Sequence, residues 1–168
     1  MRAVTFITGA SGVGKSTMLA GLAKKYADKD RVFLHFDSIG IPSLEQMNAE
    51  YGSPSAWQKA KTYEWIDTLI SKYNNKKVFF EGQVNLEFIQ KGFRKHDFTD
   101  YQIILVDCNE AEMARRLNQR GQPELFTEDM KNWLKFLRRQ GDALPIPVID
   151  TSARSEEESL QALESLIR

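Results

Sequence analysis

The residues with the clearest chemical meaning stand near the start of the chain, in the segment Gly9-Ala10-Ser11-Gly12-Val13-Gly14-Lys15-Ser16-Thr17. The segment matches the pattern G-x-x-x-x-G-K-[ST] and follows an apolar run at 3–8. Glycines can adopt backbone angles that turn successive N–H groups inward, where they bind phosphate oxygens. Lys15 would add a positive charge at the terminal phosphates, and the Ser16 hydroxyl is suited to Mg²⁺. The pattern therefore predicts a site for a nucleoside triphosphate with Mg²⁺.

The predicted nucleotide contacts come from this loop and from the start of the helix after it. They are Gly9, Ser11, Gly12, Val13, Gly14, Lys15, Ser16 and Thr17. A protein that reads guanine would also need an Asn-Lys-x-Asp segment, and the nearest candidate, Asn75-Lys76-Lys77-Val78, lacks the aspartate. ATP is therefore the favoured nucleotide.

The elements that must position this loop follow from the hydrophobic pattern. Apolar or β-branched runs of strand length occur at 3–8, 32–36, 78–80, 101–106 and 146–149. They lack strict alternation, which is typical of strands covered on both faces in a parallel sheet. Pro147 cannot donate a hydrogen bond to a neighbouring strand, so the last run is expected at a sheet edge.

Segments with helical spacing lie between these runs. One helix is expected after Gly14, another after the Ser53-Pro54 start signal, a third after Thr127, and a fourth after Ser155. Strands that alternate with helices predict an α/β fold with a central parallel sheet. In such folds the functional loops gather at the carboxyl ends of the strands.

Composition limits the class of protein. The chain has 168 residues, and its 23 Lys and Arg balance its 23 Asp and Glu, which argues against a surface that binds polyanions as a whole. No apolar run reaches the length of a membrane span, so we expect a cytoplasmic protein of one domain with no membrane partner. The one cysteine, Cys108, is expected to be a small buried residue.

At this point the sequence resembles the P-loop kinases of the adenylate, gluconate and shikimate kinase type, a group that includes chloramphenicol phosphotransferase and polynucleotide kinase. The resemblance implies a three-layer P-loop NTPase fold with a five-stranded parallel sheet in the order 2-3-1-4-5, helices on both faces and a small lid. It implies a single domain over 1–168, with an acceptor-binding insert at about 37–73 and a lid at about 116–140.

The resemblance also implies roles for four residues outside the loop. Asp37, in His35-Phe36-Asp37-Ser38, matches the family's aspartate that activates the acceptor hydroxyl, and Glu81 matches the acidic residue that holds Mg²⁺ through water. Arg116 and Arg120 match an arginine pair of which the first lies near adenine and the second touches phosphates. The predicted catalytic residues are thus Lys15, Asp37 and Arg120, and the predicted metal-binding residues are Ser16 and Glu81.

Each of these four assignments has a structural alternative. Asp37 would be an ordinary turn residue, Glu81 the partner of a nearby cation, and the two arginines solvated neighbours on one helix face. His35 falls in a predicted strand and is expected to be a core or edge residue without a catalytic role.

The charges of residues 37–56, which we call the acceptor segment, indicate the class of substrate. From Asp37 to Ala56 the sequence has three acidic residues and no Lys or Arg, and 82–90 is also free of them. A buried phosphate without cations is costly, so a phosphorylated acceptor and a nucleic-acid substrate are both disfavoured. The sequence therefore predicts an enzyme that transfers the γ-phosphate of ATP to a hydroxyl of a small, non-phosphorylated acceptor. The alternative is a module that senses ATP, with slow or absent turnover, and engages a protein or RNA partner.

Overall fold

A five-stranded parallel sheet in the order β2-β3-β1-β4-β5 forms the centre of the computed structural model, which describes residues 3–167. The strands are β1 (Val4–Thr8), β2 (Arg31–His35), β3 (Lys77–Gly82), β4 (Tyr101–Asp107) and β5 (Val148–Asp150). The strand order and the fold class are those that the sequence predicted. The last strand lies at an edge of the sheet, also as predicted, and the carbonyl of Pro147 accepts the Leu105 N–H at 3.0 Å.

Each strand differs from the predicted run by one or two residues at an end, and two of these differences need a physical explanation. Phe36 lies outside β2, in the 3-10 helix η1 (Phe36–Ile39), because the chain turns at the end of an edge strand. β5 runs from Val148 to Asp150 instead of from 146 to 149, because these three residues are the ones in register with β4. The first change matters for function, since it places Asp37 in a short helix beside the end of β3.

Seven α-helices surround the sheet in the described part of the chain. They are α1 (Lys15–Tyr26), α2 (Leu44–Tyr51), α3 (Pro54–Lys72), α4 (Leu86–Lys95), α5 (Glu110–Gln119), α6 (Glu128–Ala143) and α7 (Glu156–Leu166), with a second short 3-10 helix, η2 (Pro123–Leu125). The predicted N-caps are confirmed: Ser53, Thr127 and Ser155 each accept a backbone N–H of the following turn. Satisfying these otherwise unpaired N–H groups fixes where each helix begins.

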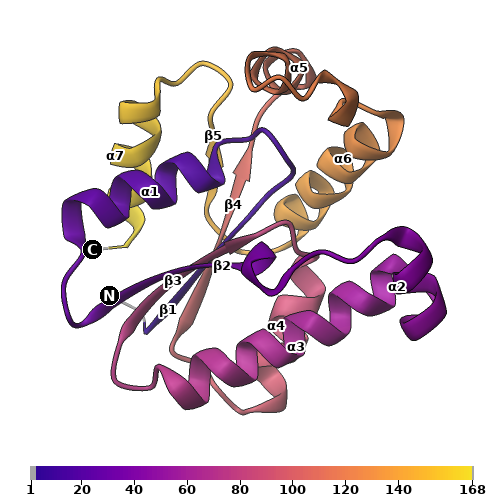
Figure 1. The fold of residues 1–168 in the computed structure, drawn as a ribbon. Helices are drawn as coiled ribbons and strands as arrows, with labels where there is room; N and C mark the ends of the chain where they lie inside the picture. Colours follow the sequence, from indigo (N-terminus) through magenta and orange to yellow (C-terminus); the bar gives the residue numbers. More distant parts are fainter. Residues whose placement is uncertain (1–2, 168) are drawn as a thin grey trace.

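The two faces of the sheet carry separate apolar clusters. Ile7 and Phe79 point to the side that α1 and α7 cover, whereas Phe6 and Phe80 point to the side that α3 and α4 cover. Figure 1 shows α1 and α7 above the sheet and α3 and α4 below it. Because both faces are buried, consecutive strand residues are apolar, which is the pattern read from the sequence.

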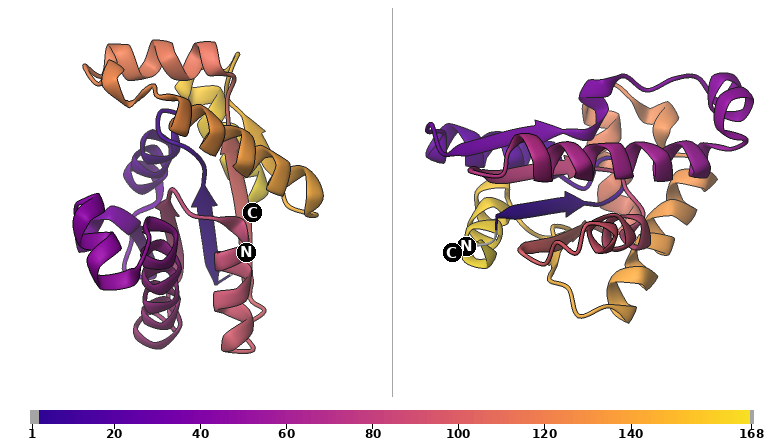
Figure 2. Two further views of the ribbon diagram at one scale, coloured as in Figure 1. Left: turned by 90° about the vertical axis from the view of Figure 1, so that its right-hand side faces the viewer. Right: turned by 90° about the horizontal axis from the view of Figure 1, so that it is seen from below.

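The connection from β2 to β3 extends beyond the body of the sheet. It contains η1, α2 and α3, and Figure 2 shows α2 at the outer end of α3. On the other side, α6 contacts β4 and α4, and Leu134 and Leu137 are fully buried. None of the helices in the part of the chain that the structure describes is long and apolar enough to cross a membrane.

Candidate functional site

The loop between β1 and α1 has the backbone that its glycines predict. Gly14 is the N-cap of α1 with φ 104°, and Gly12 has φ 82°, both in the left-handed region. A Cβ on Gly9 would lie 2.3 Å from the carbonyl oxygen of Val106, so only glycine fits there. The start of α1 has no side-chain cap, which leaves its N–H groups and the positive end of the helix directed at the loop.

Lys15 lies inside this loop and is only 6% exposed. Its ammonium donates a hydrogen bond to the carbonyl oxygen of Ala10 at 2.8 Å. Burial lowers the pKa of Lys15 from 10.5 to about 8, although the carboxylates of Glu81 and Asp37 act in the opposite direction. The free protein therefore holds a desolvated cation that an anionic ligand would stabilise.

Two further candidate residues, Ser16 and Glu81, meet beside the loop. The Ser16 hydroxyl donates to Oε1 of Glu81 at 3.1 Å, and Glu81 is 7% exposed. Nδ1 of His35 lies 2.7 Å from the same carboxylate oxygen. His35 is the last residue of the edge strand β2. The sequence predicted a core or edge residue within a strand, and its contact with Glu81 was not anticipated.

Asp37 approaches the same point from η1. The approach depends on Gly82, because a Cβ there would lie 2.5 Å from Cβ of Phe36 and would push η1 away from β3. Burial raises the pKa of Asp37, the nearby Glu81 carboxylate raises it further, and Lys15 and His35 lower it. An elevated pKa in a polar cavity is typical of a carboxylate that can take up a proton.

The predicted catalytic and metal-binding residues line one small cavity of about 110 Å³. Its lining residues are Ser11, Gly12, Gly14, Lys15, Ser16, Thr17, Asp37, Glu81, Gly82, Gln83 and Arg120. Arg120 reaches it from the C-terminal end of α5. The structure thus brings together side chains from four separate segments of the chain, and their roles remain predictions.

Arg116 occupies a different place from Arg120. It donates to the carbonyl oxygen of Val13 at 3.0 Å, to Oγ1 of Thr151 at 2.8 Å and to the Thr151 carbonyl oxygen at 2.8 Å, and its Nε lies 2.6 Å from Glu112. It therefore ties the phosphate loop to the segment after β5. The guanidinium also lines a neighbouring cavity of about 390 Å³, which opens beside the glycines of the loop. A position near adenine is compatible with this cavity and stays a prediction.

Several residues that position the site were missed at the level of sequence. The Gln58 side chain donates to the carbonyl oxygen of Gln83 and accepts from the Asn85 N–H, both at 3.0 Å, which ties α3 to the loop after β3. Asp107 accepts two hydrogen bonds from Arg138, at 2.6 and 3.1 Å, which ties α6 to the end of β4. These residue types are common and show no local pattern, so only the tertiary contacts reveal them.

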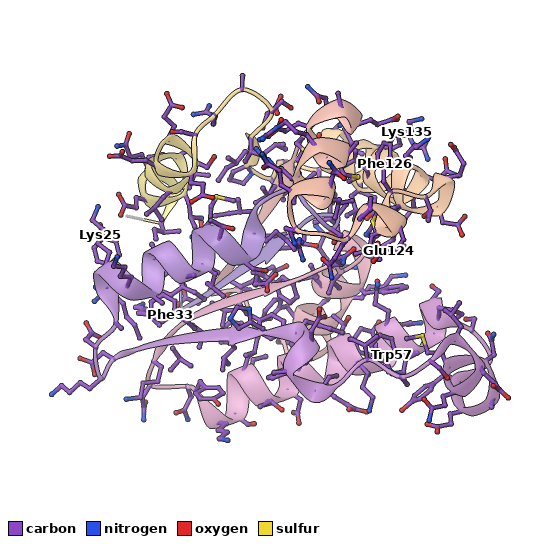
Figure 3. All side chains as sticks on the ribbon, turned by 45° about the horizontal axis from the view of Figure 1, so that its top comes forward. Lys25, Phe33, Trp57, Glu124, Phe126 and Lys135 are labelled. Atoms are coloured by element: carbon purple, nitrogen blue, oxygen red, sulfur yellow. The ribbon has the colours of Figure 1, made fainter. Side chains whose placement is uncertain are left out.

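The acceptor segment presents apolar surface. Ile39, Ile41 and Leu44 are 45%, 51% and 66% exposed. A cavity of about 420 Å³ lies against the first two, lined also by Gly40, Pro42, Glu50, Tyr51, Trp57, Lys61 and Glu64. The ammonium of Lys61 is held by Glu64 at 2.7 Å, so its charge is neutralised locally. In Figure 3, Glu124 of η2 is drawn above Trp57 of α3.

Comparison with known families identifies the chain. The model of the AAA domain matches residues 6–132, which run from β1 through the phosphate loop to the first turn of α6. The chain belongs to the AAA domain family. A P-loop domain of this kind implies nucleotide binding, in agreement with the geometry of residues 9–17. No curated protein sequence is significantly similar to this AAA domain.

Solved structures confirm the predicted resemblance to small P-loop kinases at the level of the fold. Shikimate kinase from Acinetobacter baumannii in complex with shikimate has a TM-score of 0.66 at 14% identity, covering 99% of this chain and 93% of that one. Gluconokinase from Sinorhizobium meliloti has a TM-score of 0.66 at 17% identity, covering 98% and 93%. Deoxyadenosine kinase from M. mycoides has a TM-score of 0.63 at 15% identity, covering 98% of both chains. At these identities the similarity concerns the fold, and substrates must be argued from the site.

Proposed function

We propose that this AAA domain is a phosphotransferase that moves the γ-phosphate of ATP to a hydroxyl group of a small acceptor that carries no phosphate. The observation that carries the proposal is the shared cavity of Lys15, Asp37 and Arg120. Phosphoryl transfer needs cations around the donor phosphates and a base for the acceptor hydroxyl at one point; Lys15 and Arg120 would supply the cations and Asp37 the base.

The reaction assigns a task to each group. The acceptor oxygen forms a bond to the γ-phosphorus, the bond between that phosphorus and the bridging β–γ oxygen breaks, and ADP leaves. The Asp37 carboxylate takes the proton of the acceptor hydroxyl. Lys15 and Arg120 offset negative charge on the transferred group, and the N–H groups of the loop hold the remaining phosphates.

The residues beside the loop fit Mg²⁺. Ser16 and Glu81 offer a hydroxyl and a carboxylate oxygen within 3.1 Å of each other, which are ligand types that Mg²⁺ accepts directly or through water. Within residues 3–167 no group of three His, Cys, Asp or Glu side chains is placed to hold a metal, so phosphates and water would complete the coordination. When bound, the ion would neutralise phosphate charge.

The acceptor class follows from charge and polarity. The absence of Lys and Arg from 37–56 leaves a phosphorylated acceptor without a cationic partner in that segment. Exposed Ile39 and Ile41 favour an apolar body. Because Glu64 pairs with Lys61 at the same cavity, Glu50 carries its remaining charge and favours a neutral or cationic acceptor. We therefore propose a hydroxyl compound without acidic groups, such as a nucleoside, a sugar or an aminated natural product.

A lid over this site fits the segment between α5 and α6. We propose that residues 121–127, which include η2, close over the transferred group and exclude water, so that the acceptor is phosphorylated instead of hydrolysis occurring. In the later part of the predicted lid, Leu134 and Leu137 of α6 are buried in the core. We expect α6 to stay fixed while the preceding segment moves.

The first experiment identifies the acceptor. Thermal stability is measured with a non-hydrolysable ATP analogue and Mg²⁺ against a panel of nucleosides, sugars and aminated hydroxyl compounds. Each compound that adds stability is then tested for ADP release in the presence of ATP. ATP-dependent stabilisation with no compound that accelerates ADP release would favour the ATP-sensing alternative and contradict the phosphotransferase.

The second experiment tests the base. We expect Asp37→Asn to lower the rate on the best acceptor by roughly 10²- to 10⁴-fold with little change in nucleotide affinity. The matched control is Asp67→Asn, an exposed aspartate of α3 outside the site. Because the pKa of Asp37 is raised, wild-type activity should rise with pH on the acid side at a pH above 3.8, as the carboxylate forms. Full rate in Asp37→Asn would show that the proposed base is wrong.

A further inference from the structure

We propose that His35 is a positioning residue that holds the Glu81 carboxylate toward Ser16 by donating a hydrogen bond from Nδ1. The inference rests on the proposed function of Ser16 and Glu81 as the protein's contribution to the metal site. It gives a role to a residue that the sequence placed in an edge strand without one.

The sheet itself brings the two side chains together. His35 and Glu81 are directly paired in the parallel register of β2 and β3. Their contact distance is 2.7 Å, which is short for a nitrogen-to-oxygen hydrogen bond and typical of one with an ionised partner. Oε1 of Glu81 accepts from both His35 and Ser16, so the imidazole and the hydroxyl together fix one oxygen of the carboxylate.

The need for such a restraint comes from the crowding of negative charge. Glu81 is nearly buried, and Asp37 lies close enough to disfavour a second carboxylate in the same cavity. Two like charges in a partly dry site repel each other, and a glutamate side chain can relieve this by rotating. The hydrogen bond from His35 opposes that rotation. Partners that orient a metal-binding group in this way typically change metal affinity by 10- to 100-fold.

His35 is also tied to the element that carries Asp37. The Ser38 hydroxyl donates to the carbonyl oxygen of His35 at 2.7 Å, within the turn that begins η1. The His35 side chain is 48% exposed, so it reaches Glu81 from the solvent side of the edge strand. A substitution at this position therefore removes the hydrogen bond without opening a cavity in the core.

The first test reads the proton on the imidazole directly. The sequence has only two histidines, His35 and His96, so two imidazole patterns are expected in a long-range ¹H–¹⁵N spectrum of tag-free protein, and His96→Asn assigns them. A neutral imidazole carries one proton, and in His35 that proton should be on Nδ1. A proton on Nε2 of His35 would overturn the proposal, because Nδ1 could not then donate to Glu81.

The second test measures the metal dependence of ADP binding by calorimetry, with and without Mg²⁺. His35→Phe should reduce the Mg²⁺-dependent gain in ADP affinity roughly tenfold and leave binding in EDTA unchanged. His35→Asn places an amide N–H near the position of Nδ1 and should restore most of the gain. The matched control is His96→Asn, in an exposed position after α4.

The outcomes separate this inference from the proposed function. If wild type gains affinity with Mg²⁺ and His35→Phe gains as much, His35 has no positioning role, whereas the metal site stands. If wild type shows no Mg²⁺-dependent gain, the proposed roles of Ser16 and Glu81 fail together with this inference. If His35→Phe does not fold, His35→Asn and the imidazole spectrum still decide the question.

Discussion

Replacing Lys15 by methionine should stabilise the free protein and abolish its response to nucleotide. The ammonium is buried and its pKa is lowered from 10.5 to about 8. At about 1.4 kcal/mol for each pKa unit, the charged form destabilises the free protein by about 3 kcal/mol. Methionine removes this cost but also removes the hydrogen bond to Ala10, worth about 1 kcal/mol. The net expectation is a free energy of unfolding higher by about 2 kcal/mol.

The assay is denaturant unfolding at pH 7 in EDTA without nucleotide, supported by thermal melts. A gain of about 2 kcal/mol corresponds to a rise in Tm of about 4 to 8 °C for a chain of this size. ADP with Mg²⁺ at a hundred times its Kd should add about 2.7 kcal/mol to wild type and nothing measurable to Lys15→Met. The variant thus separates the stability of the fold from its function.

The pH dependence of the free energy of unfolding tests the same electrostatic cost of Lys15 independently. Between pH 8 and 10.5 the unfolded chain keeps the Lys15 proton and the folded protein has lost it, so wild-type stability should rise with pH there. The advantage of Lys15→Met should be fully present below pH 8 and shrink as the pH rises. A variant less stable than wild type at pH 7, or an advantage that does not change with pH, would refute the electrostatic reasoning.

Two further changes test how the site is held. Arg116→Lys should weaken ADP binding about tenfold, because a lysine cannot replace the forked hydrogen bonds to Val13 and Thr151. Calorimetry of Arg139→Lys, an exposed arginine of α6 that lines neither cavity of the site, provides the control, and equal affinities for the two variants would argue against the clamp. Asp107→Asn should lower the free energy of unfolding by about 2 to 3 kcal/mol and leave ADP affinity unchanged, since its carboxylate binds Arg138 and lines neither cavity beside the phosphate loop. A loss of stability below about 0.5 kcal/mol, the value expected of a surface ion pair, would contradict a structural role for this pair, of which only the Asp107 carboxylate is buried.

The helices show which starts could be predicted from capping residues in the sequence. The Ser155 and Glu158 capping box and the Ser53-Pro54 start were readable because a cap involves residues three apart. The helices α2 and α4 were not predicted, although their signals were present. Ser43 and Gln46 form a capping box before α2, and Asn85 caps an amphipathic α4.

For the candidate site, the sequence indicated which residues belong to it, and the structure gave their surroundings. The predicted roles of four residues came from the resemblance to P-loop kinases: Asp37, Glu81, Arg116 and Arg120. In the structure, Asp37, Glu81 and Arg120 line one cavity. Arg116 is instead bound to backbone carbonyl oxygens of two separate loops. Nothing in its spacing from Arg120 indicated that the two arginines have different surroundings.

The sequence by itself determined the phosphate loop, the caps of several helices and the alternation of strands and helices. Each of these depends on residues close together in the chain, where glycine angles, capping side chains and apolar periodicity act directly. Only the tertiary structure decided that Ser16 and His35 contact the same carboxylate oxygen of Glu81, from which they are 65 and 46 residues away in the sequence. That meeting depends on the register of β2 with β3 and on the close approach that Gly82 allows to Phe36. These contacts join residues that are far apart in the sequence, so they could not be read from neighbouring residues.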